Sequence, residues 1–119
     1  MPKQSVRIYH NPRCTKSRQA LELLRERGIT PDVVEYLKTP PSAAEVKELV
    51  RMLKVAPHEL LRSKEAAYAE QKLSKTSGLD QIAEAIARAP ILLERPVVVV
   101  GKRAVIGRPP EKVLELLGT

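Results

Sequence analysis

The sequence predicts an α/β protein with a small mixed sheet of about four strands, flanking helices and a helical insertion. Three observations lead to this class. Short β-prone runs stand near both ends of the chain, helix-periodic segments fill the middle, and residues 38–93 hold no strand-like run. Because 119 residues suffice for one hydrophobic core, we expect a single domain over residues 1–119 with its helical insertion at about 38–93.

The first elements form a β-α-β unit. Residues 6–9 suit a strand, and Asn11-Pro12 ends it. A helix follows, and its apolar face consists of Ala20, Leu21, Leu23 and Leu24. The helix stops at Arg27-Gly28, and residues 32–36 have the composition of a second strand. We expect the two strands to be parallel and joined by a right-handed crossover.

The middle of the chain is helical. Ser42 and Glu45 form a capping box, Pro57 opens a short helical piece, and residues 66–73 are compatible with a further helix. The segment 62–65 between these pieces has the composition of a solvated connection. A last helix of this block is expected at residues 80–89, with an inward face of Ile82, Ala83, Ala85 and Ile86.

The C-terminal part returns to strands. Residues 96–100 are a continuous β-branched run, typical of a strand covered on both faces, and residues 104–106 are its antiparallel partner after a Gly101-Lys102 turn. Pro109-Pro110 opens the last helix, whose inward residues are Val113, Leu114, Leu116 and Leu117. The order β-α-β, helical block, β-β-α is that of a thioredoxin-like fold with a helical insertion.

Cys14 is the candidate reactive residue. It stands in the loop between the first strand and the first helix, where unpaired N–H groups and the helix dipole favour a thiolate. Arg13, Lys16, Arg18 and His10 are nearby in sequence. Such surroundings lower a cysteine pKa from about 8.5 to between roughly 3.5 and 7.5. The alternative reading is a small buried residue that happens to fall in a loop.

The composition excludes several classes of site. One cysteine permits neither an internal disulfide nor a CxxC redox couple, and we expect no metal site because no Cys/His cluster has ligand spacing. A net charge of +7 and a pI near 9.8 favour anionic partners. We expect no nucleic-acid partner, because the chain has neither Trp nor Phe to stack on bases and no nucleic-acid recognition motif. No apolar run is long enough to span a membrane, so we expect a cytoplasmic protein.

Five sequence motifs occur together and in order, and they point to a known family. They are His10–Arg18, Tyr36–Pro41, Leu60–Arg62, Pro90–Val99 and Gly107–Glu111. Together they resemble the glutaredoxin-linked arsenate reductase (ArsC) family over residues 6–117. The resemblance implies a thioredoxin-like fold and a role in arsenic detoxification.

The resemblance also implies a mechanism. Cys14 would be the catalytic, redox-active cysteine, and Arg62, Arg95 and Arg108 would hold arsenate or a similar small oxyanion. External glutathione would act as co-substrate, glutaredoxin would complete the reduction, and no cofactor would be bound. Arginine suits the clamp because its planar guanidinium meets a tetrahedral oxyanion with paired, charge-assisted hydrogen bonds.

Three further residues match family positions around the thiolate: His10, Ser17 and Arg18. Pro96 matches a proline that thioredoxin-like proteins hold in the cis form opposite the cysteine. From residue statistics alone a trans proline is the default, since only about 5–6% of X–Pro bonds are cis.

Two other functions remain open at this point. One is a glutathione-dependent thiol oxidoreductase of the same fold without arsenate turnover, in which the arginines would bind glutathione carboxylates. The other is a non-enzymatic regulator related to the Spx proteins, which bind RNA polymerase. Those regulators commonly carry a CxxC switch, and Ser17 occupies the position of its second cysteine here.

Overall fold

The computed structural model describes residues 5–117. The chain divides into two compact units, and each is treated by itself. The sheet unit comprises Met1–Tyr36 and Arg95–Thr119, and the helical unit comprises Leu37–Glu94. The bounds of the helical unit lie within one residue of the helical block expected at residues 38–93. That the whole chain is a single domain stays a prediction.

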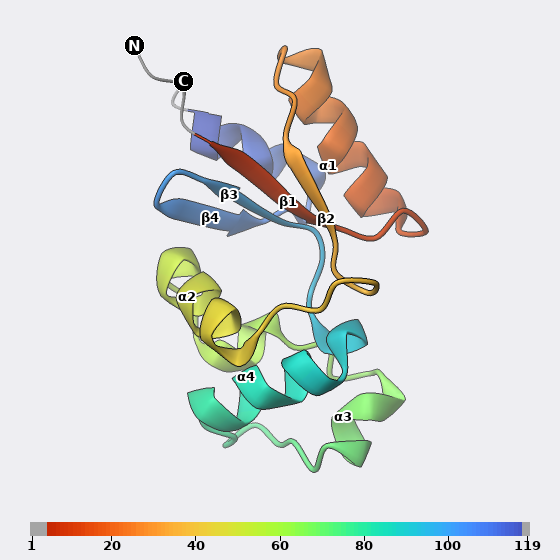
Figure 1. The fold of residues 1–119 in the computed structure, drawn as a ribbon, viewed down its shortest axis with the longest axis vertical. Coiled ribbons are helices and arrows are strands. Elements are labelled where there is room, and N and C mark those ends of the chain that lie inside the picture. Colours follow the sequence, from red (N-terminus) through yellow and green to blue (C-terminus); the bar gives the residue numbers. More distant parts are fainter. Residues whose placement is uncertain (1–4, 118–119) are drawn as a thin grey trace. The chain divides into compact units, whose positions relative to one another are not determined.

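The sheet unit is built on a four-stranded mixed sheet, which confirms the predicted fold class. Its strands are β1 (Val6–His10), β2 (Asp32–Glu35), β3 (Val97–Val100) and β4 (Arg103–Ile106). The spatial order is β2-β1-β3-β4 (Figure 1). β1 pairs with β2 in parallel, as the β-α-β pattern predicts, and β3 pairs antiparallel with both β1 and β4. The C-terminal end of β1 therefore lies inside the sheet, where the loop toward Cys14 begins.

Two helical segments pack against this sheet, α1 (Thr15–Glu26) and the 3₁₀ helix η3 (Pro110–Leu117). The core between them consists of Ile8, Ala20, Leu21, Leu24, Val98, Val100, Val113 and Leu116. Leu23 and Leu114, predicted to face inward, are only partly buried, and the side chain of Leu117 lies outside the described residues. α1 ends where expected, because Gly28 takes a φ of +76° that favours glycine.

The helical unit contains α2 (Ala43–Leu53), η1 (Pro57–Leu60), α3 (Ala66–Glu70), α4 (Leu79–Arg88) and η2 (Pro90–Leu92). Ser42 caps α2 as predicted, since its hydroxyl oxygen accepts the Glu45 N–H at 3.1 Å. The helix predicted for residues 66–73 is too long. α3 stops at Glu70, and Lys72 takes a left-handed φ of +57° that no α-helix continues through. η2 was not foreseen in the sequence.

Backbone hydrogen bonds hold the segment around Arg62 against residues 92–94 of the same unit. Leu61 and Leu93 form an isolated antiparallel bridge. The N–H of Arg62 donates to the carbonyl of Leu92 at 2.8 Å, and the N–H of Glu94 donates to the carbonyl of Leu60 at 2.8 Å. The backbone of Arg62 is thus fixed on both sides.

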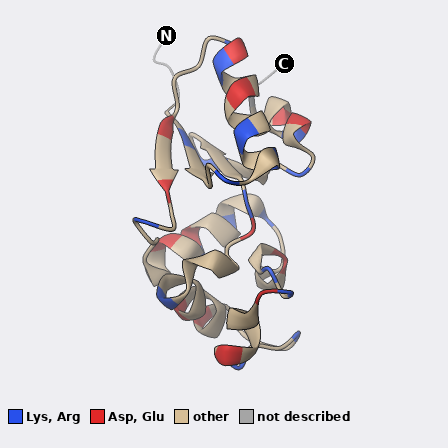
Figure 2. Ribbon diagram, turned by 90° about the vertical axis from the view of Figure 1, so that its right-hand side faces the viewer, with Lys and Arg blue, Asp and Glu red and all other residues tan. Residues whose placement is uncertain are grey.

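Charged residues of both signs are interleaved along the helices of each unit (Figure 2). In the helical unit, Lys47 and Asp80 approach to 2.6 Å, and Arg88 and Glu84 to 3.7 Å. Within residues 5–117, no helix combines the length and apolar character that crossing a membrane requires.

Candidate active site

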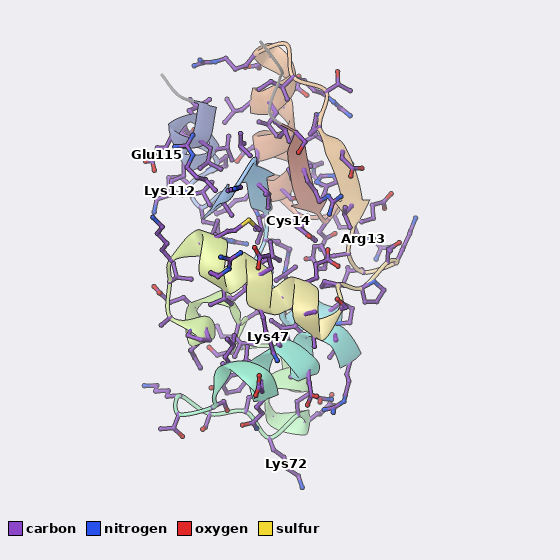
Figure 3. All side chains as sticks on the ribbon, turned by 60° about the vertical axis from the view of Figure 1, so that its left-hand side comes forward. Arg13, Cys14, Lys47, Lys72, Lys112 and Glu115 are labelled. Carbon is purple, nitrogen blue, oxygen red and sulfur yellow. The ribbon has the colours of Figure 1, made fainter. Side chains whose placement is uncertain are left out.

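Cys14 is the residue at the junction of the β1–α1 loop and α1. Its backbone is extended, with φ −94° and ψ 122°, and it is the N-cap of α1. Its N–H donates to the carbonyl of Asn11 at 2.9 Å, and its own carbonyl accepts the first helical hydrogen bond, from Arg18 N–H at 3.0 Å. The side chain is partly buried, and its sulfur is the labelled yellow atom in Figure 3. This is the loop position that the sequence predicts.

The surroundings lower the pKa of the Cys14 thiol below its ordinary value. Partial burial is the largest single influence and acts in the opposite direction, because it disfavours the charged thiolate. Hydrogen bonds from the backbone N–H of Ser17 and from the Arg95 guanidinium, the positive charge of Arg95, and the backbone N–H of Lys16 together outweigh it. The thiolate is thus held by the first turn of α1 and by one arginine.

Two arginines of the sheet unit meet at the sulfur. Nη2 of Arg108 lies 3.9 Å from Cys14 Sγ, and the Arg95 guanidinium also hydrogen-bonds the thiolate. Nε of Arg108 donates to the backbone carbonyl of Arg95 at 2.7 Å, so the two arginines are linked to each other. This link was not foreseen, because no sequence pattern signals a contact between a guanidinium and a distant carbonyl.

A tight backbone contact keeps these two arginines together. The Arg95–Pro96 bond is cis, as the family resemblance implies, and the Arg108–Pro109 bond is also cis, which was not foreseen. The N–H of Gly107 donates to the carbonyl of Pro96 at 2.8 Å. A Cβ added at Gly107 would lie 2.9 Å from Pro96 Cγ, so glycine allows this close approach.

His10 and Ser17 form a buried pair beside the loop. Nδ1 of His10 lies 2.7 Å from Oγ of Ser17, and the same oxygen accepts the Asn11 N–H at 3.0 Å. Burial lowers the pKa of His10; the positive charges of Arg25 and Arg18 add to this, and the negative charge of Glu35 opposes it. A lowered pKa means that His10 is neutral at pH 7. His10 therefore orders the loop through the Ser17 hydroxyl, while the Ser17 backbone reaches the thiolate.

Arg18, expected near the thiolate, is bound to the loop itself. Its Nη1 donates to the carbonyl of Pro12 at 2.8 Å, and its Nη2 donates to Oγ1 of Thr15 at 3.3 Å. Both acceptors flank Cys14 in the chain. Arg18 thus braces the loop that carries the cysteine and adds positive charge near His10.

Arg62, the third arginine of the expected clamp, belongs to the helical unit. Its Nη2 lies 3.2 Å from Oε2 of Glu65. The composition of segment 62–65 predicts a solvated connection, which is wrong for these two side chains, since both are largely buried. The spacing of three residues between opposite charges could have signalled the pair.

The arrangement is suited to nucleophilic attack on an anion. An ionised sulfur supplies the nucleophile, and the guanidinium groups of Arg95 and Arg108 supply donors for the oxygens of a tetrahedral ligand.

Across residues 5–117 there is no group of three or more His, Cys, Asp or Glu side chains that could hold a metal ion.

Comparisons with known proteins agree with this geometry. A profile of the ArsC family matches residues 9–116. An Escherichia coli K12 protein named "Uncharacterized protein YfgD" is 48% identical, across 99% of this chain and 100% of that protein. The arsenate reductase of Neisseria meningitidis serogroup A is 44% identical, across 94% of this chain and 97% of that protein. The solved structure of an arsenate reductase from Vibrio cholerae is 45% identical, with a TM-score of 0.90 over 96% of this chain and 98% of that one.

Proposed function

Because the chain belongs to the ArsC family, we propose that it is an arsenate reductase whose nucleophile is the Cys14 thiolate. Family membership confirms the resemblance drawn from the motifs. The observation that supports the proposal most is the meeting of Arg95 and Arg108 at the Cys14 sulfur. A thiolate alone suits many reactions, but a thiolate among guanidinium groups is suited to an oxyanion substrate.

In the proposed reaction, the Cys14 sulfur forms a bond to arsenic and one arsenate oxygen leaves as water. Glutathione then attacks arsenic, so that a second As–S bond forms and a second oxygen leaves as water. A glutaredoxin thiolate attacks the glutathione sulfur: an S–S bond forms between glutaredoxin and glutathione, the As–S bond to glutathione breaks, and its electron pair reduces As(V) to As(III). Water then displaces the Cys14 sulfur from arsenic, which releases arsenite and regenerates the Cys14 thiolate.

The arginines have separate roles in this scheme. Arg95 hydrogen-bonds the thiolate before the substrate arrives, and it then neutralises charge on the bound oxyanion. Arg108 supplies a second guanidinium and positions Arg95 through the Arg95 carbonyl. We propose Arg62 as the third oxyanion ligand, on the strength of the family motif at Leu60–Arg62. His10, Ser17 and Arg18 maintain the loop that holds the sulfur.

The test is a coupled assay with arsenate, glutathione, glutaredoxin, glutathione reductase and NADPH. We expect arsenate-dependent loss of NADPH that disappears in Cys14→Ser. Arg95→Ala and Arg62→Ala should lower the rate by about a hundredfold each, the size expected for one lost transition-state donor. Arg51→Ala is the matched control, because Arg51 pairs with Glu48 on an exposed face of α2.

Each outcome has a distinct meaning. Arsenate-dependent activity that survives Cys14→Ser would reject Cys14 as the nucleophile. Equal small effects from the three arginine variants would reject the clamp. No arsenate-dependent activity in folded, reduced protein, together with turnover of a glutathione mixed disulfide, would favour a thiol oxidoreductase of the same fold.

A further inference from the structure

The ion pair between Arg62 and Glu65 is sheltered in a way that exposed pairs of the same unit are not. Nη2 of Arg62 and Oε2 of Glu65 are 3.2 Å apart, and the two side chains are 22% and 28% exposed. The Arg88–Glu84 pair has side chains that are 65% and 60% exposed. Exposed pairs contribute little to stability, because water and salt screen them. The Arg62–Glu65 pair interacts more strongly, since solvent screens it less.

A backbone hydrogen bond also joins the two residues of this pair. The N–H of Glu65 donates to the carbonyl of Arg62 at 3.1 Å, which closes a turn directly before α3 (Figure 1). Glu65 is the N-cap of α3, yet its side chain makes no capping hydrogen bond. An acidic N-cap usually accepts an N–H of the first helical turn. Here the carboxylate bonds Arg62 instead, so the pair is held in place and does not serve the helix end.

One nitrogen of the same guanidinium has no acceptor. Nη1 of Arg62 is buried and makes no hydrogen bond to any of the residues that the structure describes. Buried polar atoms in proteins nearly always have a partner, and an orphaned donor on a cation is costly. The guanidinium of Arg62 is therefore only partly paired. Its Nη2 bonds the Glu65 carboxylate, and its Nη1 can donate to another acceptor.

We propose that Glu65 makes anion binding at Arg62 selective for tetrahedral anions that carry a proton, such as arsenate and phosphate, over sulfate. The proposal rests on the proposed function, in which Arg62 is an oxyanion ligand. An anion oxygen that accepts from Nη1 lies beside the carboxylate that accepts from Nη2, because the two nitrogens belong to one guanidinium.

The selectivity follows from the chemistry of a carboxylate. Ionised Glu65 only accepts hydrogen bonds. Arsenate and phosphate carry at least one O–H near neutral pH, and that group can donate to Glu65. Sulfate carries none at this pH, so its oxygens and the carboxylate repel each other. Glu65 thus adds one hydrogen bond for the protonated anions and one unfavourable contact for sulfate.

The test compares inorganic phosphate and sulfate as probes at constant ionic strength. Isotope-labelled protein is titrated with each anion, and dissociation constants are taken from changes in the amide NMR spectrum. We expect wild type to bind phosphate about tenfold or more tighter than sulfate, the size expected for a hydrogen bond to a charged group. Glu65→Gln should bring the two constants close together, because an amide can donate to sulfate as well as accept.

Glu48→Gln is the matched control, since Glu48 also pairs with an arginine three residues away, but on an exposed face. It should keep the wild-type preference, and a fold check by circular dichroism accompanies each variant. Equal affinities in wild type, or a preference unchanged in Glu65→Gln, would overturn the proposal. Because neither probe is reduced, a selective protein without arsenate turnover would support this inference and reject the proposed function. Binding of neither anion would reject both.

Discussion

Replacing Ser17 by alanine should lower stability while leaving the thiolate largely intact. The Ser17 side chain is fully buried, and its oxygen lies 2.7 Å from His10 Nδ1 and accepts the Asn11 N–H at 3.0 Å. Ser17→Ala removes the oxygen and leaves both partners without it. The hydrogen bond that reaches Cys14 comes from the backbone of Ser17, which alanine also has.

The magnitude follows from burial. Leaving one buried partner unsatisfied costs about 1–3 kcal/mol. His10 is buried and carries most of this cost, whereas the Asn11 amide is partly accessible, so water can replace some of its lost bond. We therefore expect Ser17→Ala to lower the free energy of unfolding by about 2 kcal/mol.

Urea denaturation followed by circular dichroism measures the stability, and the ultraviolet absorbance of the thiolate against pH measures the Cys14 pKa. Ser5→Ala is the control: Ser5 is exposed and its carbonyl, which accepts from Gly101 N–H, is retained. Its effect should stay within about 0.5 kcal/mol. A Ser17→Ala variant as stable as Ser5→Ala would refute the argument. A large rise in the Cys14 pKa would show that the hydroxyl acts on the sulfur directly.

Three further predictions address charge and packing. Arg95→Gln should raise the pKa of Cys14, because the variant loses both a hydrogen bond and a positive charge at the thiolate. The rate of Cys14 alkylation as a function of pH measures this pKa, and Arg51→Gln is the control. The same pH dependence in both variants would contradict the prediction. Burial first of all lowers the pKa of His10, so the unfolded chain binds its proton more readily, and stability falls as pH drops below the ordinary histidine value of about 6.5. Urea titrations at several pH values measure this loss of stability, in a Cys14→Ser background where the thiol no longer titrates. There, His10→Gln should make the free energy of unfolding fall less steeply as the pH drops. An unchanged dependence of the free energy of unfolding on pH would contradict the prediction. Leu24→Ala should lower the free energy of unfolding by about 2–5 kcal/mol, because Leu24 is fully buried between α1 and the sheet. Leu37→Ala, at an exposed position, should lower it far less. Similar urea midpoints for the two variants would contradict this prediction.

Local patterns in the sequence carry most of the fold. The β-branched run at residues 97–100 became the buried strand β3, and Gly28 ended α1 with a positive φ. These elements depend on side-chain periodicity and on backbone freedom, which neighbouring residues determine. The same local reasoning failed at α3, which ends at Glu70, three residues before the end of the expected helix span, because Lys72 takes a left-handed φ.

The position of Cys14 was also predictable from the sequence, because a turn between a strand and a helix is a local feature. The partners of its sulfur were not. Arg108 is 94 residues away, and its contact depends on the pairing of β3 with β1 and on the close approach of Gly107 to Pro96. Taken singly, each arginine could equally be a solvated surface residue. Among the features of the sequence, only the family resemblance selects them.

The sequence alone therefore determined the order of the elements and the loop that presents the cysteine, since both follow from interactions over a few residues. The tertiary structure decided which side chains meet. It joined His10 to the Ser17 hydroxyl and bound Arg108 to the Arg95 carbonyl. Such contacts depend on where packing places whole segments and on which buried donors still need an acceptor, and no local pattern encodes either.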